Sequence, residues 1–197
     1  MNDKTSRVAL ILGAFLAGLF LFFAAILVVT GRAPVGQAVA AVGGPFRLED
    51  QNGKAVTDAD MKGKPFLVFF GYTHCPDVCP TTLFDLSQLL KELGPDADRT
   101  NALFITVDPE RDTQQVMKDY LSNFDPHLRG LTGDRASIDA AIKAYRVYAK
   151  KVPLENGDYT MDHTALVYLM DKNGHFVAPF DVSRTPAVEA ADLRRYL

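Results

Sequence analysis

The chain has 197 residues and a formal net charge of −3, with 48% hydrophobic residues, 23% charged residues and two cysteines. This ordinary composition argues against a disordered chain, and the mild negative charge argues against the basic face that nucleic-acid binding needs. Two cysteines are too few for a disulfide-scaffolded miniprotein or for a four-cysteine zinc site.

The first predicted element is an apolar helix over residues 8–30, which carry no charge. A helix of that length spans about 34 Å, enough to cross a bilayer core of about 30 Å. Lys4 and Arg7 precede it, so the positive-inside rule places residues 1–7 in the cytoplasm. We therefore predict a single-pass anchor in a bacterial inner membrane, with the rest of the chain in the periplasm.

Two alternatives to an uncleaved anchor fit the N-terminal segment less well. A cleaved signal peptide could end at the A-x-A-like residues 38–40, but its apolar region would be shorter than residues 8–30. A mitochondrial presequence, and with it the mitochondrial inner membrane, is less favoured because the start carries Asp3 and few arginines.

Residues 31–44 are small and almost uncharged, which predicts a flexible linker before a domain at residues 45–197. The domain should begin with a hairpin, because residues 46–49 alternate in polarity and residues 50–54 supply turn chemistry. Continuous apolar runs at residues 66–70 and 102–107 then predict strands buried on both faces.

Helices are expected between and after these strands. Apolar spacing predicts four of them: one that ends at Gly94-Pro95, one capped by Asp112, one over residues 134–148, and one that starts at Thr185-Pro186. A turn at residues 171–174 predicts a terminal hairpin of residues 165–169 and 176–180. This order predicts an α/β domain with a central mixed sheet flanked by helices. Two cysteines directly after a buried strand favour the thioredoxin-like class.

The sequence GYTHCPDVCP at residues 71–80 lies where a predicted strand meets a predicted helix. Pro76 and Pro80 disfavour helical backbone at the residues before them, so Cys75 and Cys79 are both expected in a loop. Pro80 suits the first helical position. The positive end of the helix dipole should then lower the pKa of the Cys79 thiol.

Two cysteines with three residues between them can form a disulfide or hold a soft metal ion. A structural disulfide is natural in an oxidising compartment, although so short a loop gains little entropic stabilisation. A thiol–disulfide enzyme is a further alternative, but such enzymes usually have only two residues between the cysteines.

A third side chain favours a metal. His163 lies at the predicted start of the terminal hairpin strand, and in a thioredoxin-like fold this end faces the cysteine loop. Soft thiolates select Cu(I), imidazole binds copper in either state, and three ligands suffice for a trigonal site. Zinc would require a fourth ligand. We therefore predict one copper ion per chain, held by Cys75, Cys79 and His163.

Three separated motifs resemble the Sco/SenC family of copper chaperones: GYTHCPDVCP at residues 71–80, VDPERDT at residues 107–113, and DHT at residues 162–164. The resemblance covers residues 45–197, and the predicted anchor also fits it. It implies a thioredoxin-like fold that binds Cu(I) or Cu(II) through the two motif cysteines and the histidine. It further implies a role in maturing the copper-A centre of cytochrome c oxidase subunit II, with copper received from an upstream donor protein.

A metallochaperone of this kind would not be an enzyme. The same residues also permit an alternative function. Cys75 and Cys79 could be the redox pair of a membrane-tethered thiol–disulfide reductase that acts on the copper-ligand cysteines of the oxidase. Peroxide reduction is a weaker third hypothesis. Of the neighbouring residues, His74 should point away from the site. The resemblance implies that Asp108 belongs to its surroundings or to partner docking.

Overall fold

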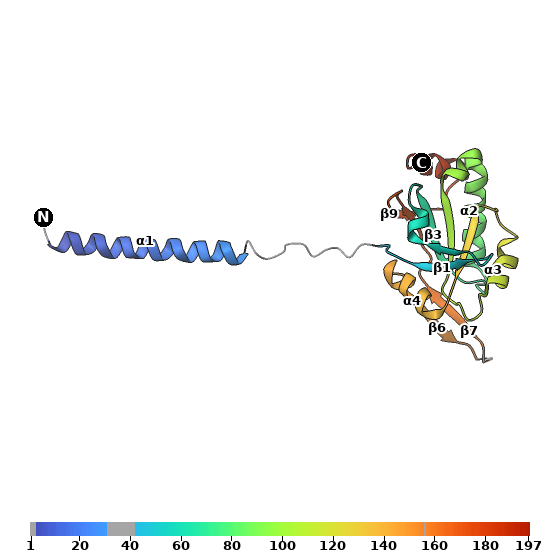
Figure 1. Cartoon of the computed structure of the whole chain (residues 1–197), viewed down its shortest axis with the longest axis horizontal. Helices are drawn as coiled ribbons and strands as arrows, with labels where there is room; N and C mark the ends of the chain where they lie inside the picture. Colours follow the sequence, from blue (N-terminus) through green and yellow to red (C-terminus); the bar gives the residue numbers. More distant parts are fainter. Residues whose placement is uncertain (1–2, 31–41, 156) are drawn as a thin grey trace. The chain divides into compact units, whose positions relative to one another are not determined.

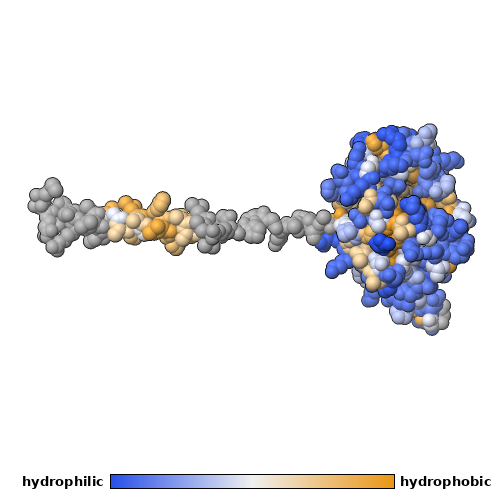
Figure 2. Space-filling model, viewed as in Figure 1, coloured by the Kyte–Doolittle hydropathy of each residue, from blue (hydrophilic) through white to orange (hydrophobic). Residues whose placement is uncertain are grey.

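The computed structural model describes residues 3–30, 42–155 and 157–197, and the chain divides into two compact units, Met1–Ala40 and Ala41–Leu197 (Figure 1). The first unit contains α1 (Asp3–Thr30). Its described side chains, at residues 12–26, are apolar and almost all exposed (Figure 2). Among the helices of the described ranges, none is both long and apolar enough to cross a membrane. Most of the predicted linker, residues 31–41, lies outside the described residues.

The second unit is built on a mixed sheet with the strand order β2-β1-β5-β4-β3-β8-β9. The central strands β3, β4 and β5 are parallel, and the remaining neighbours are antiparallel. The strands of this sheet are β1 (Arg47–Asp50), β2 (Ala55–Thr57), β3 (Phe66–Gly71), β4 (Asn101–Thr106), β5 (Leu128–Thr132), β8 (Val167–Met170) and β9 (Phe176–Phe180).

Helices cover this sheet, as the thioredoxin-like prediction requires. α2 packs beside α5, α3 lies against β5, and α4 contacts β1. The bounds are η1 (Asp58–Met61), α2 (Val78–Leu93), η2 (Gly94–Arg99), α3 (Gln114–Leu121), α4 (Arg135–Ala144) and α5 (Pro186–Arg194). β3 is buried along its whole length, which agrees with its continuous apolar sequence. The visible surface of this unit is mainly hydrophilic, with smaller apolar areas (Figure 2).

The hairpin of β6 (Ala149–Pro153) and β7 (Tyr159–His163) forms a separate two-stranded sheet at one end of the unit (Figure 1). Its register pairs Ala149 with His163. The prediction that His163 starts the terminal hairpin strand is therefore wrong. His163 is the last residue of β7, and the terminal hairpin begins only at Val167, where side chains enter the core.

Three predicted helix boundaries also differ from the structure. α2 begins at Val78, so Cys79 lies in its first turn rather than in the preceding loop. Pro80 is tolerated there because the first amide groups of a helix have no partner within it. Thr113, not Asp112, caps α3 by accepting a hydrogen bond from the Val116 amide at 3.3 Å.

The third predicted helix, residues 134–148, is shorter than expected. Asp134 caps it as a side-chain acceptor for the Ser137 amide, but α4 ends at Ala144. Arg146 takes a left-handed backbone conformation with φ of 54°, which turns the chain toward β6. The last predicted helix is confirmed, with Pro186 at its first position.

Candidate metal centre

β3 delivers the chain to the site at Gly71, its last residue. A Cβ atom at Gly71 would lie 2.7 Å from Cys79 Sγ and 2.7 Å from the Phe104 ring. No side chain fits there, so glycine allows the first turn of α2 to approach the end of β3. The Cys75 amide donates to the Tyr72 carbonyl at 3.3 Å, which folds the connecting loop back toward the strand.

The structure brings the three predicted ligands together. The two sulfur atoms and an imidazole nitrogen of His163 all lie within 4.8 Å of one another. Cys79 Sγ is 3.5 Å from His163 Nε2, and the Cys79 amide donates to Cys75 Sγ at 3.4 Å. Both thiols are free. Cys79 is buried, whereas Cys75 and His163 keep part of their surface accessible.

The imidazole of His163 is oriented by its other nitrogen. Nδ1 lies 3.1 Å from the Thr164 carbonyl oxygen. Because a carbonyl only accepts hydrogen bonds, Nδ1 is the protonated nitrogen and the lone pair of Nε2 faces Cys79. The ring stands perpendicular to the Tyr72 ring, with centroids 5.7 Å apart. Burial lowers the pKa of His163, which favours the neutral form that binds metals.

Burial also decides the chemistry of Cys79, and the predicted lowering of its pKa is wrong. The side chain is inaccessible to solvent, and this burial raises the pKa of the Cys79 thiol far above its usual value. The effect of the helix N-terminus is too small to compensate. A buried thiolate needs a compensating charge, and a coordinated cation supplies one.

A fully buried carboxylate, Asp112, supports the loop that precedes Cys75. It accepts hydrogen bonds from the Thr73 amide at 3.1 Å, from the Thr73 hydroxyl at 2.6 Å and from the Thr106 hydroxyl at 2.6 Å. Burial raises the pKa of Asp112 although these hydrogen bonds oppose the shift. The loop is thereby tied to the end of β4, a connection that the sequence did not indicate.

His74 lies outside the donor group, as expected. Its side chain is 52% exposed and its Nδ1 is 3.1 Å from the Thr73 hydroxyl and 3.9 Å from the Asp112 carboxylate. The other two histidines are also elsewhere: His127 contacts Asp125, and His175 lies near Asp171.

Asp108 acts on the site through the β6–β7 hairpin. It is 1% exposed and accepts hydrogen bonds from Arg111 Nε at 2.5 Å and from the Tyr159 hydroxyl at 2.9 Å. The Arg111 guanidinium lies 3.7 Å from the centroid of the Tyr159 ring, and its Nη1 donates to the Tyr159 carbonyl at 3.0 Å. We call these contacts of Asp108, Arg111 and Tyr159 the hairpin latch. They fix β7, and therefore also His163, the last residue of that strand. The VDPERDT motif was the only sequence signal for them.

Two sulfurs and one imidazole nitrogen form a soft donor set. Among the described residues, no fourth cysteine, histidine or carboxylate joins the group. Three donors of this kind suit Cu(I), which accepts trigonal ligation, better than Zn²⁺, which is almost always four-coordinate in structural sites. The geometry therefore fits the copper ion that the residue types predict.

Comparisons with known proteins agree with this geometry. The SCO1/SenC family model matches residues 35–197. The chain is 40% identical over 162 residues to the mitochondrial protein SCO1 homolog of Homo sapiens, covering 79% of this chain and 53% of that protein, so it spans about half of that relative. It is 38% identical to the SCO2-like protein RP587 of Rickettsia prowazekii, covering 75% of this chain and 74% of that one.

Solved structures extend the comparison to the fold. Bradyrhizobium japonicum ScoI with copper bound is 68% identical, with a TM-score of 0.78 over 80% of this chain and 100% of that chain. Yeast Sco1 with copper bound is 37% identical, with a TM-score of 0.72 over 79% of this chain and 88% of that chain.

Proposed function

This chain belongs to the SCO1/SenC family, and from that premise we propose that it is a metallochaperone that delivers copper to cytochrome c oxidase subunit II and helps to mature its copper-A centre. The observation that carries the proposal is the convergence of Cys75, Cys79 and His163 within 4.8 Å. Two similar structures are described as having copper bound, which supports copper as the cargo.

Transfer would proceed by exchange of ligands. Two thiolates and a neutral imidazole around Cu(I) leave one net negative charge, and trigonal ligation leaves room for a thiolate of the partner. Cys75 is the more accessible of the two sulfurs, so we expect the partner's thiolate to replace Cys75 before Cys79. An upstream donor protein would load the site by the reverse exchange.

We also propose the location of the protein. Residues 1–7 lie in the cytoplasm, residues 8–30 form a membrane anchor, residues 31–44 a linker, and residues 45–197 the periplasmic copper-binding domain. The uncharged, apolar sequence of residues 8–30 supports the anchor. Protease protection in spheroplasts tests the topology: the domain should be digested from outside. Release of the domain into the soluble periplasm would instead indicate cleavage near residues 38–40.

A second candidate function rests on the same cysteines. Because both thiols are free and close together, the protein could reduce the copper-ligand cysteines of its partner. The two functions are compatible, since copper binding itself requires reduced thiols. The reduction potential of the Cys75–Cys79 pair separates them: a potential more oxidising than that of the partner's cysteines would exclude the reductase function.

Anaerobic copper titration of the reduced protein tests the main proposal. We expect tight one-to-one binding by the wild type and none by the Cys75→Ala/Cys79→Ala double variant. Failure of the reduced wild-type protein to bind copper would exclude the metallochaperone and leave thiol–disulfide exchange as the better proposal.

A further inference from the structure

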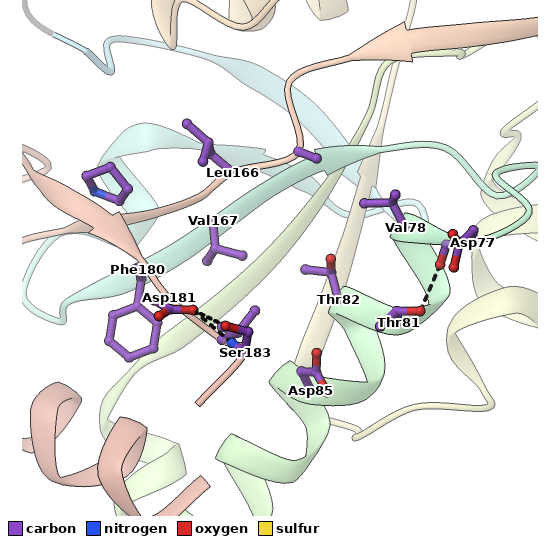
Figure 3. Close-up of a pocket in the computed structure, with 13 residues that line it drawn as sticks. Asp77, Val78, Thr81, Thr82, Asp85, Leu166, Val167, Phe180, Asp181 and Ser183 are labelled. Carbon is purple, nitrogen blue, oxygen red and sulfur yellow. Dashed lines mark hydrogen bonds between the residues drawn. The ribbon is translucent and has the colours of Figure 1, made fainter. Parts of the chain in front are cut away.

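A pocket of about 500 Å³ lies beside the start of α2, the helix whose first turn contains Cys79 (Figure 3). The first two turns of α2 form one side, and the segment before β8 together with the end of β9 forms the other. Two of its lining residues, Asp77 and Val78, lie between the two cysteines in the sequence, and Leu166 follows His163 by three residues. A molecule seated in the pocket would therefore touch residues that are close in sequence to all three candidate ligands.

The pocket offers apolar surface that a folded domain normally buries. Val78 is 44% exposed and Leu166 is 46% exposed, and they lie on opposite sides of the pocket (Figure 3). The buried side chains of Val167 and Phe180 also line the pocket. Exposed leucine and valine beside a concave surface are typical of a place where another protein packs.

The charged side chains that line this pocket all have the same sign. Asp77, Asp85 and Asp181 line the pocket, and its lining contains no lysine, arginine or histidine. Asp181 is partly compensated, because Ser183 donates to its carboxylate at 2.7 Å and Arg184 lies 3.7 Å away. Asp85 is half-buried, and burial raises its pKa.

A second acidic side chain, on α5, lies close to Asp85 and does not compensate its negative charge. Glu189 on α5 is 1% exposed and interacts with Asp85 through charge repulsion. Its Oε1 has no hydrogen-bond partner within the described structure. Of these two neighbouring acidic side chains, Asp85 lies at the pocket surface, where a cation from outside can reach it.

We propose that this pocket is the docking surface for the copper-receiving protein, and that it takes a surface segment in which an apolar side chain stands beside a lysine or arginine. The apolar side chain would pack between Val78 and Leu166, and the cation would pair with Asp85. The proposal rests on the proposed function, because the occupant is the protein to which copper passes. Complementary charge would orient the partner and speed the encounter.

Charge also separates this occupant from two others. A second copy of the chain carries the same net charge of −3 and would present another acidic pocket. An anionic lipid surface would be repelled by the same three aspartates. A basic, apolar segment of another protein is the occupant that both features of the pocket favour.

The test measures copper transfer from the full chain in detergent micelles to the copper-free soluble domain of oxidase subunit II. Leu166→Gln removes the apolar contact. Leu154→Gln is its matched control, because Leu154 is almost equally exposed, at 45%, but lies outside the pocket near the far end of the β6–β7 hairpin. Asp85→Lys reverses the charge, and Glu92→Lys is the control at the exposed C-terminal end of the same helix. Asp85→Asn keeps the shape of the side chain and guards against misfolding of the lysine variant.

All five variants should bind copper with the affinity of the wild type. We expect Leu166→Gln and Asp85→Lys to slow second-order transfer by about tenfold, and the two controls to stay within about twofold. Added salt should slow transfer from the wild type more than transfer from Asp85→Lys. Wild-type rates in Leu166→Gln, Asp85→Lys and Asp85→Asn would overturn the docking surface while leaving the proposed delivery of copper intact.

The proposed function can fail separately. If the wild type binds copper but transfers none, delivery to subunit II is wrong, and the pocket is then judged by fluorescence anisotropy of the labelled domain with the same variants. Binding that weakens in Leu166→Gln and Asp85→Lys would support the pocket, and absence of binding would overturn it.

Discussion

Gly71 shows how strongly one position without a side chain constrains the candidate metal centre. An added methyl group would lie 2.7 Å from both Cys79 Sγ and the Phe104 ring, so strand and helix would have to separate. We expect Gly71→Ala to destabilise the domain by about 1–3 kcal/mol and to weaken copper binding. Denaturant unfolding and copper titration measure the two effects. Unchanged copper affinity would show that the sulfur position is not held by this contact.

His163 and His74 allow a matched test of the ligand assignment. His163→Ala should weaken Cu(II) binding by at least about tenfold, because the variant keeps the two sulfurs but loses the imidazole. His74→Ala should leave the affinity nearly unchanged, because His74 is half-exposed and outside the donor group. Competition with a chelator of known affinity measures both. Equal loss in the two variants would remove His163 from the site as a specific ligand.

At the scale of residues, the sequence predicted which side chains meet but not how they are held. Cys75, Cys79 and His163 could be named because their types and order indicate soft-metal chemistry. The contact of Gly71 with Cys79 depends on the packing of two elements, which no short motif records. The pKa of Cys79 was predicted in the wrong direction because the sequence shows the helix start but not the depth of burial.

At the scale of elements, the β6–β7 hairpin is the part of the site that the sequence did not reveal. Apart from the buried Met161, its residues 149–153 and 159–163 are half-buried or exposed, and they include charged side chains. They therefore lack the apolar runs that identified β3 and β4. The hairpin carries His163 at its end. The hairpin latch of Asp108, Arg111 and Tyr159 ties it to the segment that follows β4.

Removing the latch should loosen this element. We expect Arg111→Met to destabilise the domain by about 1–3 kcal/mol, since it leaves the buried Asp108 carboxylate without its cation. Amide exchange in β7 should accelerate more than exchange in β3. Lys151→Met is the control, because Lys151 lies 3.5 Å from the same Tyr159 ring but outside the ion pair. Equal exchange rates in the two variants would show that stacking on Tyr159, rather than the ion pair, fixes the hairpin.

At the scale of the whole molecule, the order of elements was predictable and some members of the sheet were not. The apolar runs of β3 and β4 and the turn residues of the two hairpins β1–β2 and β8–β9 carry clear patterns, so the mixed sheet could be inferred. β5 could not, because its sequence LRGLT contains an arginine and a glycine. It becomes a strand because β4 and β1 supply hydrogen-bonding neighbours on both sides. Its Gly130 admits Leu121 and Met117 of α3 where a side chain would not fit.

The packing of α5 against α2 makes the stability of the whole domain depend on pH. Burial, with a further contribution from Asp85, raises the pKa of Glu189 to about 7 from an ordinary value of 4.5. The folded state therefore holds a proton on Glu189 that the unfolded chain has already lost. The resulting penalty is absent below about pH 4.5, grows as the pH rises, and is complete above about pH 7, where it amounts to about 3 kcal/mol at most.

Glu189→Gln removes this titration while keeping the shape of the side chain. We expect the variant to be more stable than the wild type at pH 8 and nearly equal to it at pH 4.5, so the difference in the free energy of unfolding should appear between those values. Urea unfolding at a series of pH values measures it. The exposed control Glu92→Gln should show no such dependence, because Glu92 lies at the surface of α2. A gain of the same size at every pH would mean that Glu189 is neutral throughout, and that its unpartnered oxygen rather than its charge costs the stability.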